Sequence, residues 1–142
     1  MINLGKTSKE ITQHVFYELL NTAEFDKRVS TLPVSKKKLF WLRSPLEALS
    51  VGATEVVFPA FQLDGRVNHY LLWRVRELYT ISKLPEALVW DFLRTRHKLL
   101  NGMTGVDFLL GHFSREITEL APRERDEHFI DLVQEEIWRL LQ

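Results

Sequence analysis

Histidine and cysteine most often hold metals in proteins, and this sequence offers them no recognisable site. The chain has no cysteine, which excludes disulfides and thiolate zinc sites. Its five histidines are scattered, and no two have the i, i+4 spacing with a glutamate that a zinc protease needs. We therefore predict no metal site. The histidines are His14, His69, His97, His112 and His128.

Sequence patterns of other catalytic chemistry are absent as well. The sequence contains no glycine-rich phosphate loop and no Gly-x-Ser-x-Gly turn around a nucleophilic serine. Asp91 and Asp107 stand alone rather than as an evident pair for general acid and base catalysis. We predict that the protein is not an enzyme, has no catalytic residue and binds no cofactor.

A lysine run, Lys36, Lys37 and Lys38, is the segment best suited to bind a polyanion. Ser35 before it is a good N-cap, so the run is expected to form the first turn of a helix. Together with the helix expected before it, this segment has the outline of a degenerate helix-turn-helix, whose lysines would contact DNA phosphates. The alternative is a solvated lysine face, although three cations are unfavourable at the positive end of a helix dipole.

The two ends of the chain differ in charge, although the net formal charge is zero. Residues 1–50 contain eight basic and five acidic residues, a net charge of +3. Residues 101–142 contain four basic and nine acidic residues, a net charge of −5. This polarity indicates different partners at the two ends, with chance surface charge as the alternative.

Apolar residues at helical spacing predict a mainly α-helical protein. Thr104 is a good N-cap with Asp107 three positions later, and Gly111 suits the residue after a helix. The last helix begins at Pro122, has a strongly acidic polar face, and carries Trp138 as a natural anchor for a partner groove. The other helices are expected over residues 8–21, 23–30 and 68–79, from Pro85 onward, and over 114–120.

The stretch from Val56 to Gly65 interrupts the helical pattern. Val56, Val57 and Phe58 favour a β-strand, and Pro59 limits it to an edge or a kink. We predict a short β-hairpin or bent strand near residues 55–64. Its expected role is that of a structural joint, which Phe58 and Phe61 pack, Gln62 fixes through hydrogen bonds, and Pro59 and the turn Asp64-Gly65 shape.

This joint suggests two parts to the chain. Residues 1–54 are predicted to form a helical, helix-turn-helix-like part for DNA contact or dimerisation, and residues 55–142 a helical binding domain. No apolar run approaches the ~20 residues of a membrane span. Residues 1–6 lack the apolar core of a signal peptide. We therefore expect a cytoplasmic protein without a membrane partner.

The stretch Phe58-Pro59-Ala60-Phe61-Gln62-Leu63-Asp64-Gly65 resembles the ParS/Xre-type antitoxin family, in which a similar motif precedes a C-terminal toxin-binding domain. The resemblance continues through residues 90–93 and 100–111, where the sequence is similar to the family's Leu-x-Gly-x-x-Pro-x-x-Leu-Leu-x-x-Gly ending. It spans residues 34–121. The chain departs from the pattern at Leu63, where an aromatic residue is usual, at Thr104-Gly105, which replaces a proline, and in the degenerate lysine segment.

The resemblance implies a type II antitoxin that binds and sterically neutralises a cognate toxin, commonly a RES-domain enzyme that degrades NAD. It places Asn101, Thr104 and Asp107, together with the anchor Trp138, as candidate toxin-binding residues. It also implies a homodimer that represses its own operon by contacting operator DNA through the N-terminal part. The alternative is a stand-alone helix-turn-helix transcriptional regulator.

Overall fold

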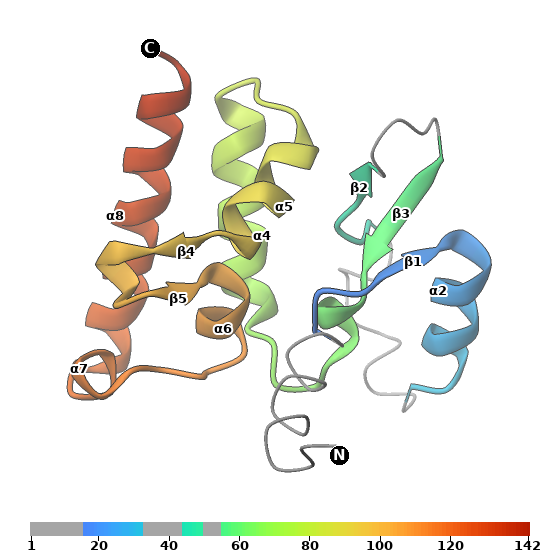
Figure 1. Ribbon diagram of the computed structural model, residues 1–142, viewed down its shortest axis with the longest axis horizontal. Coiled ribbons are helices and arrows are strands. Elements are labelled where there is room, and N and C mark those ends of the chain that lie inside the picture. Colours follow the sequence, from blue (N-terminus) through green and yellow to red (C-terminus); the bar gives the residue numbers. More distant parts are fainter. Residues whose placement is uncertain (1–15, 33–43, 50–54) are drawn as a thin grey trace, which may run out of the picture. The chain divides into compact units, whose positions relative to one another are not determined.

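The computed structural model describes residues 16–32, 44–49 and 55–142, which are mainly α-helical with short antiparallel strands, as predicted (Figure 1). The chain divides into two compact units, Met1–Gly65 and Arg66–Gln142. This boundary falls after the predicted joint rather than before it, at residue 54, because the strand in the joint pairs with strands of the first unit. The first residues of the chain and the segment with Ser35, Lys36, Lys37 and Lys38 lie outside the described residues.

The described part of the first unit is built around a three-stranded antiparallel sheet. Its strands are β1 (Leu19–Asn21), β2 (Ala48–Leu49) and β3 (Val56–Pro59), in the order β1-β3-β2. Helix α2 (Thr22–Ser30) follows β1, and a 3-10 helix, η2 (Ala60–Leu63), follows β3. Leu20, Phe25, Phe58 and Ala60 form its core, in which the rings of Phe25 and Phe58 stack with centroids 4.6 Å apart.

One local prediction for this unit is corrected by the sheet. Residues 19–21, expected at the end of a helix, form β1, because Leu20 pairs with Phe58 and is fully buried there. The stretch 55–64 contains a short strand as predicted, since β3 pairs with β1 and β2 and then passes into η2. Asn21 ends the strand and caps α2 in a capping box with Glu24, which fixes the strand-to-helix turn.

Pro59 was predicted to mark an edge or a kink, and it lies at the end of the central strand, where the chain passes into η2. It is the last residue of β3 and pairs only with Leu19 of β1, because β2 extends only as far as Val56 and Val57. The Ala60 amide donates to the Glu18 carbonyl at 2.8 Å. Because amides alternate in direction along an antiparallel strand, an amide at residue 59 would point away from β1, and proline loses no bond to it.

The second unit is helical apart from one two-stranded hairpin. Helices α4 and α8 run side by side in the same direction, and α5 and α6 pack against α4 (Figure 1). No helix in the described ranges has both the length and the apolar composition for crossing a bilayer. In order, its elements are α4 (His69–Ile81), α5 (Glu86–Arg94), β4 (Arg96–His97), the 3-10 helix η3 (Lys98–Leu100), β5 (Met103–Thr104), α6 (Gly105–Leu109), α7 (Arg115–Thr118) and α8 (Pro122–Leu140).

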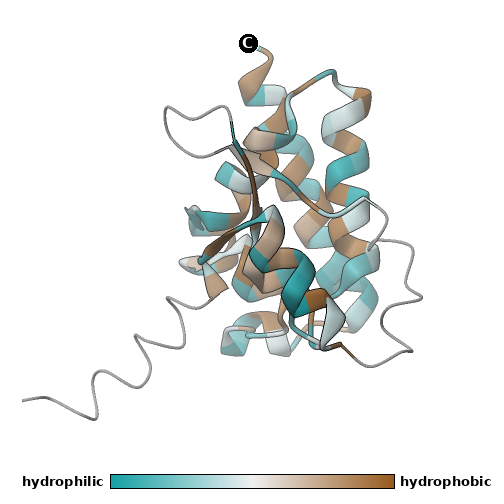
Figure 2. Cartoon of the chain, turned by 90° about the vertical axis from the view of Figure 1, so that its right-hand side faces the viewer, coloured by the Kyte–Doolittle hydropathy of each residue, from teal (hydrophilic) through white to brown (hydrophobic). Residues whose placement is uncertain are grey.

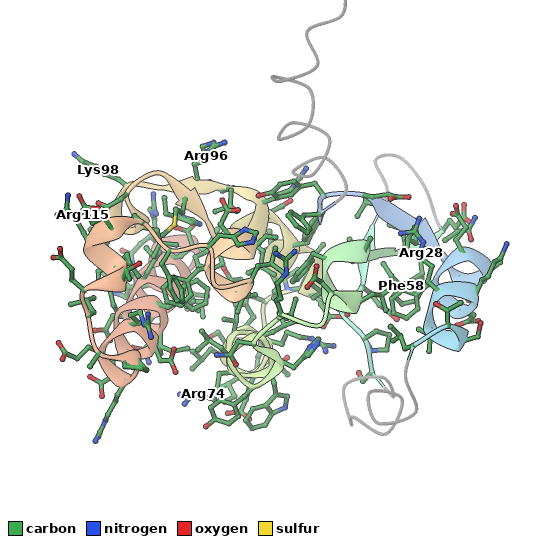
Figure 3. All side chains as sticks on the ribbon, turned by 90° about the horizontal axis from the view of Figure 1, so that it is seen from below. Arg28, Phe58, Arg74, Arg96, Lys98 and Arg115 are labelled. Atoms are coloured by element: carbon green, nitrogen blue, oxygen red, sulfur yellow. The ribbon has the colours of Figure 1, made fainter. Side chains whose placement is uncertain are left out.

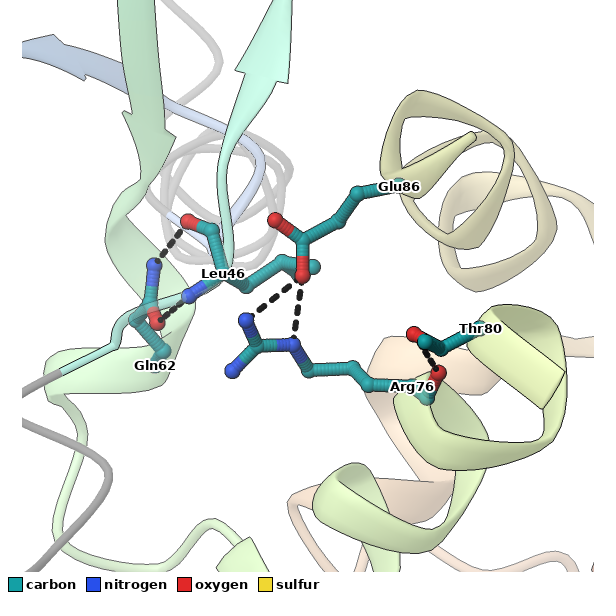
Figure 4. A network of polar contacts seen from close by, with 5 residues as sticks. All are labelled: Leu46, Gln62, Arg76, Thr80 and Glu86. Carbon is teal, nitrogen blue, oxygen red and sulfur yellow. Dashed lines mark hydrogen bonds and ion pairs between the residues drawn. The ribbon is translucent and has the colours of Figure 1, made fainter. Parts of the chain in front are cut away.

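Aromatic rings join the helices of this unit in its core. Phe129 of α8 is fully buried and stacks on Phe108 of α6, with centroids 4.5 Å apart and planes 7° apart. Phe92 of α5 meets Phe129 edge to face at 5.9 Å. At the surface between α4 and α5, the Arg76 guanidinium pairs with Glu86 at 2.6 Å (Figure 4). Buried aromatic rings therefore hold the predicted helices together, and the Arg76–Glu86 ion pair adds a polar contact at the surface.

Gly105, the first residue of α6, allows α6 to approach α5 closely. A Cβ atom there would lie 2.8 Å from Leu93 Cδ2 and 3.0 Å from Leu93 Cα, and Leu93 is fully buried. We expect Gly105→Ala to lower the free energy of unfolding by about 2 kcal/mol because the core must shift. Helix propensity alone predicts the opposite sign, a gain of ~0.5–1 kcal/mol. Urea unfolding decides between them, and a more stable variant would contradict this packing.

Candidate functional site

The predicted joint is held by one buried side chain amide, that of Gln62. Its Oε1 accepts from the Leu46 amide at 2.8 Å, and its Nε2 donates to the carbonyl oxygens of Leu46 at 2.9 Å and Pro59 at 3.0 Å (Figure 4). Leu46 is itself fully buried. The amide therefore pairs with the Leu46 backbone as a neighbouring strand would, directly before β2 begins.

The other joint residues close the first unit around this amide. Phe58 belongs to the core described above (Figure 3), and Phe61 is almost fully buried. The Asp64 amide donates to the Phe61 carbonyl at 2.9 Å and ends η2. Gly65 is exposed and is the last residue of the unit. The joint thus stabilises the end of the first unit through the hydrogen bonds of Gln62 and the buried rings of Phe58 and Phe61.

Three of the predicted toxin-binding residues lie in the segment from the turn after η3 to the first turn of α6, and they have structural contacts. Thr104 and Asp107 form the capping box of α6. Asn101 has a left-handed backbone, with φ 55°, in the turn before β5, and its amide nitrogen donates to Ser114 Oγ at 3.1 Å. Gly111 ends α6 with φ 82°, as predicted for the residue after a helix. Thr104, Asp107 and Asn101 therefore each have a structural role that requires no bound partner protein.

Trp138, the fourth predicted residue, is placed differently. It lies near the C-terminal end of α8 with 65% of its surface exposed, and the hydrophobic character of α8 continues to that end (Figure 2). Asp131 and Gln134 precede it by seven and four positions, so the three side chains lie on one side of the helix. Trp138 therefore belongs to a surface that α8 shares with its neighbour α4.

We define the α4–α8 face by the exposed and half-buried residues that these two helices present beside their shared groove. Arg74 projects from the outward side of α4 (Figure 3). Tyr70 and Ile81, 63% and 69% exposed, share this side of α4, and the Trp73 ring lies 6.1 Å from the Tyr70 ring. Its α8 residues are Asp126, Glu127, Ile130, Asp131, Gln134 and Trp138.

A groove of about 310 Å³ runs between the two helices in this face. Three carboxylates line it, against the single cation Arg74. Glu127 pairs with Arg123 at 3.2 Å, but Asp126 and Asp131 form no ion pair within the described residues. The face therefore combines exposed rings with uncompensated negative charge, which suits a partner with an apolar and basic surface.

The sequence prediction missed the α4 half of this face. Helical spacing relates the apolar residues Val67, Leu71, Leu72 and Val75, and the structure buries them. The residues left over, Tyr70, Trp73, Glu77 and Ile81, also repeat at helical spacing, on the opposite side. A large aromatic pair on the polar side of an amphipathic helix was the signal that could have located it.

The described histidines make structural contacts. The His97 ring bonds the Phe92 carbonyl at 2.8 Å, and the His128 ring bonds the Leu99 carbonyl at 2.7 Å. Within residues 16–32, 44–49 and 55–142, no three side chains of histidine, aspartate or glutamate gather in a way that could hold a metal ion.

Comparisons of the chain with protein-family models, with curated proteins and with solved structures each find no match.

Proposed function

We propose that this protein is an antitoxin-like binding protein that neutralises a cognate toxin by covering its substrate entrance. The toxin of this proposal is a RES-type enzyme that degrades NAD. Two features support the proposal: the resemblance of residues 58–65 and 100–111 to ParS/Xre-type antitoxins, and the α4–α8 face. Steric neutralisation needs a surface and no catalytic residue in the antitoxin itself.

The observation that carries the proposal is the composition of the α4–α8 face. Tyr70, Ile81 and Trp138 are each more than 60% exposed. Large rings in an exposed patch are typical of sites that bind proteins, because burying them in a complex removes apolar surface from water. Asp126 and Asp131 beside them favour a basic partner and discriminate against acidic ones.

The N-terminal part has a separate role in this proposal. Ser35, Lys36, Lys37 and Lys38 are proposed to contact operator DNA in a homodimer that represses its own operon in the cytoplasm. These residues lie outside the described ones, so the DNA role rests on the lysine run and on the resemblance. Toxin binding is assigned to the second unit, whose surface is described in full.

Co-expression with the product of the neighbouring open reading frame tests the proposal. We expect that product to arrest growth when expressed alone, and we expect co-expression of this chain to restore growth. The two proteins should co-purify on a tag placed on either of them. A neighbouring product that is harmless alone, or that neither co-purifies nor is neutralised, would contradict the proposed function.

A further inference from the structure

A second and larger groove, of about 620 Å³, lies within the second unit and is separate from the α4–α8 face. It runs between α5, the segment β4–η3 and α8, and its volume falls in the range of small-molecule sites. Leu88 and Phe92 line it from α5, and Leu132 and Leu140 line it from α8. Its walls therefore offer an apolar surface of the size of a small ring compound.

Tyr79 of α4 lines this groove and has an unusual hydroxyl group. The side chain is 1% exposed, and the hydroxyl has no hydrogen-bond partner among the described residues. A buried donor without an acceptor costs about 1–3 kcal/mol, and such groups are rare in folded proteins. A phenylalanine would fill the same core volume without this cost, so packing alone does not account for the tyrosine.

The charges around the phenol define which acceptor suits it. Burial, with further contributions from the Glu136 and Asp91 carboxylates, raises the pKa of the Tyr79 phenol well above its ordinary value. The group therefore stays protonated at neutral pH and remains a hydrogen-bond donor. Asp91 pairs with Arg94 at 2.6 Å, and Glu136 pairs with Arg139. The Glu136 and Asp91 carboxylates near the phenol disfavour an anion at the hydroxyl, which leaves an uncharged acceptor.

The rim of the groove is balanced in charge. Its carboxylates are Asp91, Glu135 and Glu136, and its cations are Arg96, Lys98 and Arg139. Arg96 and Lys98 project from the β4–η3 edge (Figure 3), and Arg96 donates to the Gly102 carbonyl at 3.0 Å. The three negative and three positive formal charges cancel, so the rim favours neither a cationic nor an anionic ligand.

From these observations we propose that the α5–α8 groove binds a small uncharged ligand with an apolar ring and an amide or carbonyl group, whose oxygen accepts the hydrogen bond of the Tyr79 hydroxyl. The ring lies against Phe92 and Leu132. In the structure the hydroxyl is covered, so the ligand must displace a side chain at the rim. Arg139 suits this movement because its side chain is 69% exposed and it lies on the helix surface.

Benzamide is the probe, and the full-length protein labelled with ¹⁵N is the sample. We expect saturable amide shifts in α5, η3 and α8 with a dissociation constant of about 1–10 mM, as for an unoptimised fragment. Benzoate has nearly the same shape with a negative charge, so it should bind about tenfold more weakly or give no shifts. In Tyr79→Phe, benzamide affinity should fall about 3- to 10-fold because one hydrogen bond is lost.

Stability separates a ligand site from a structural role for the hydroxyl. Tyr79→Phe should unfold at an equal or higher urea concentration than the original chain, since it removes an unsatisfied donor. Tyr17→Phe, which removes a phenol hydroxyl from the first unit, should leave benzamide binding unchanged. The proposal is overturned if benzamide gives no saturable shift up to about 20 mM. It is also overturned if Tyr79→Phe binds benzamide as tightly as the original chain, or if that variant is less stable.

Discussion

Gln62→Leu is expected to lower the free energy of unfolding of the first unit by about 3 kcal/mol. Leucine has nearly the same size, so the change removes the amide without leaving a large cavity. The amide and carbonyl of Leu46 then lose their partner while remaining buried, and each unsatisfied group costs ~1–3 kcal/mol. Because Gln62 also joins β3 to the segment before β2, β2 should lose hydrogen-exchange protection first.

Urea unfolding with hydrogen exchange measures this effect. The matched control is Gln134→Leu, the same substitution at an exposed position of α8, for which we expect a change within about 0.5 kcal/mol. Equal stability of Gln62→Leu and the original chain would show that Leu46 finds other partners, and the joint would then lose its assigned role.

Gln62→Glu adds a test that depends on pH. A carboxylate still accepts from the Leu46 amide, but it cannot donate to the carbonyl oxygens of Leu46 and Pro59, and it would be buried beside them. Burial favours the protonated form, so the pKa of this carboxyl in the folded state lies above its value in the unfolded state. The folded state then binds more protons, and stability should rise as pH falls toward the unfolded-state pKa. Denaturation at a series of pH values, compared with the original chain, measures the difference.

Local signals in the sequence located most of the second unit. The Thr104 side chain accepts from the Asp107 amide and Pro122 is the first residue of α8, so both helices begin as predicted. The helix predicted from residue 68 begins after Asn68, whose side chain accepts from the Leu71 amide. Such signals succeed because a cap or a positive φ is decided within a few residues. Helical spacing of apolar residues is also a local signal, and it indicated the buried faces of these helices.

The first unit was less predictable because its sheet joins distant segments. Leu19 pairs with Pro59, and Ala48 pairs with Val57, so each strand forms only through partners far along the chain. Residues 19–21 follow a helical pattern, and the pairing overrides that local preference. The expectation that a buried Gln62 needs partners was sound, but nothing local could name Leu46 as the partner.

For a related reason, the sequence indicated only the α8 half of the α4–α8 face. Trp138 stood out at the end of an acidic helix, whereas no role was predicted for Tyr70 and Trp73 of α4. Their exposure depends on which side of α4 meets α5, α6 and α8, and that is decided by packing. The unpaired state of Asp126 and Asp131 likewise depends on the tertiary neighbours of α8.

Trp138→Ala is expected to weaken binding of the cognate partner about 30- to 100-fold, mainly through faster dissociation. An exposed tryptophan that becomes buried in a complex contributes about 2 kcal/mol or more, which corresponds to this range. The folded chain should keep its stability, because the side chain is 65% exposed in the free protein. Leu99→Ala, at an exposed apolar residue outside the α4–α8 face, serves as the control and should bind the partner normally.

The carboxylates of the same face should act mainly on the association rate. Combining Asp126→Asn with Asp131→Asn removes the charges that attract a basic partner, so association should slow several-fold at low salt and depend less on ionic strength. Glu119→Gln, at the C-terminal cap of α7, removes one carboxylate outside the face and is the control. Surface plasmon resonance at several salt concentrations separates the two rates. A partner that binds the Trp138 and aspartate variants as it binds the original chain would place its interface elsewhere on the molecule, while the complex itself would still support the proposed function.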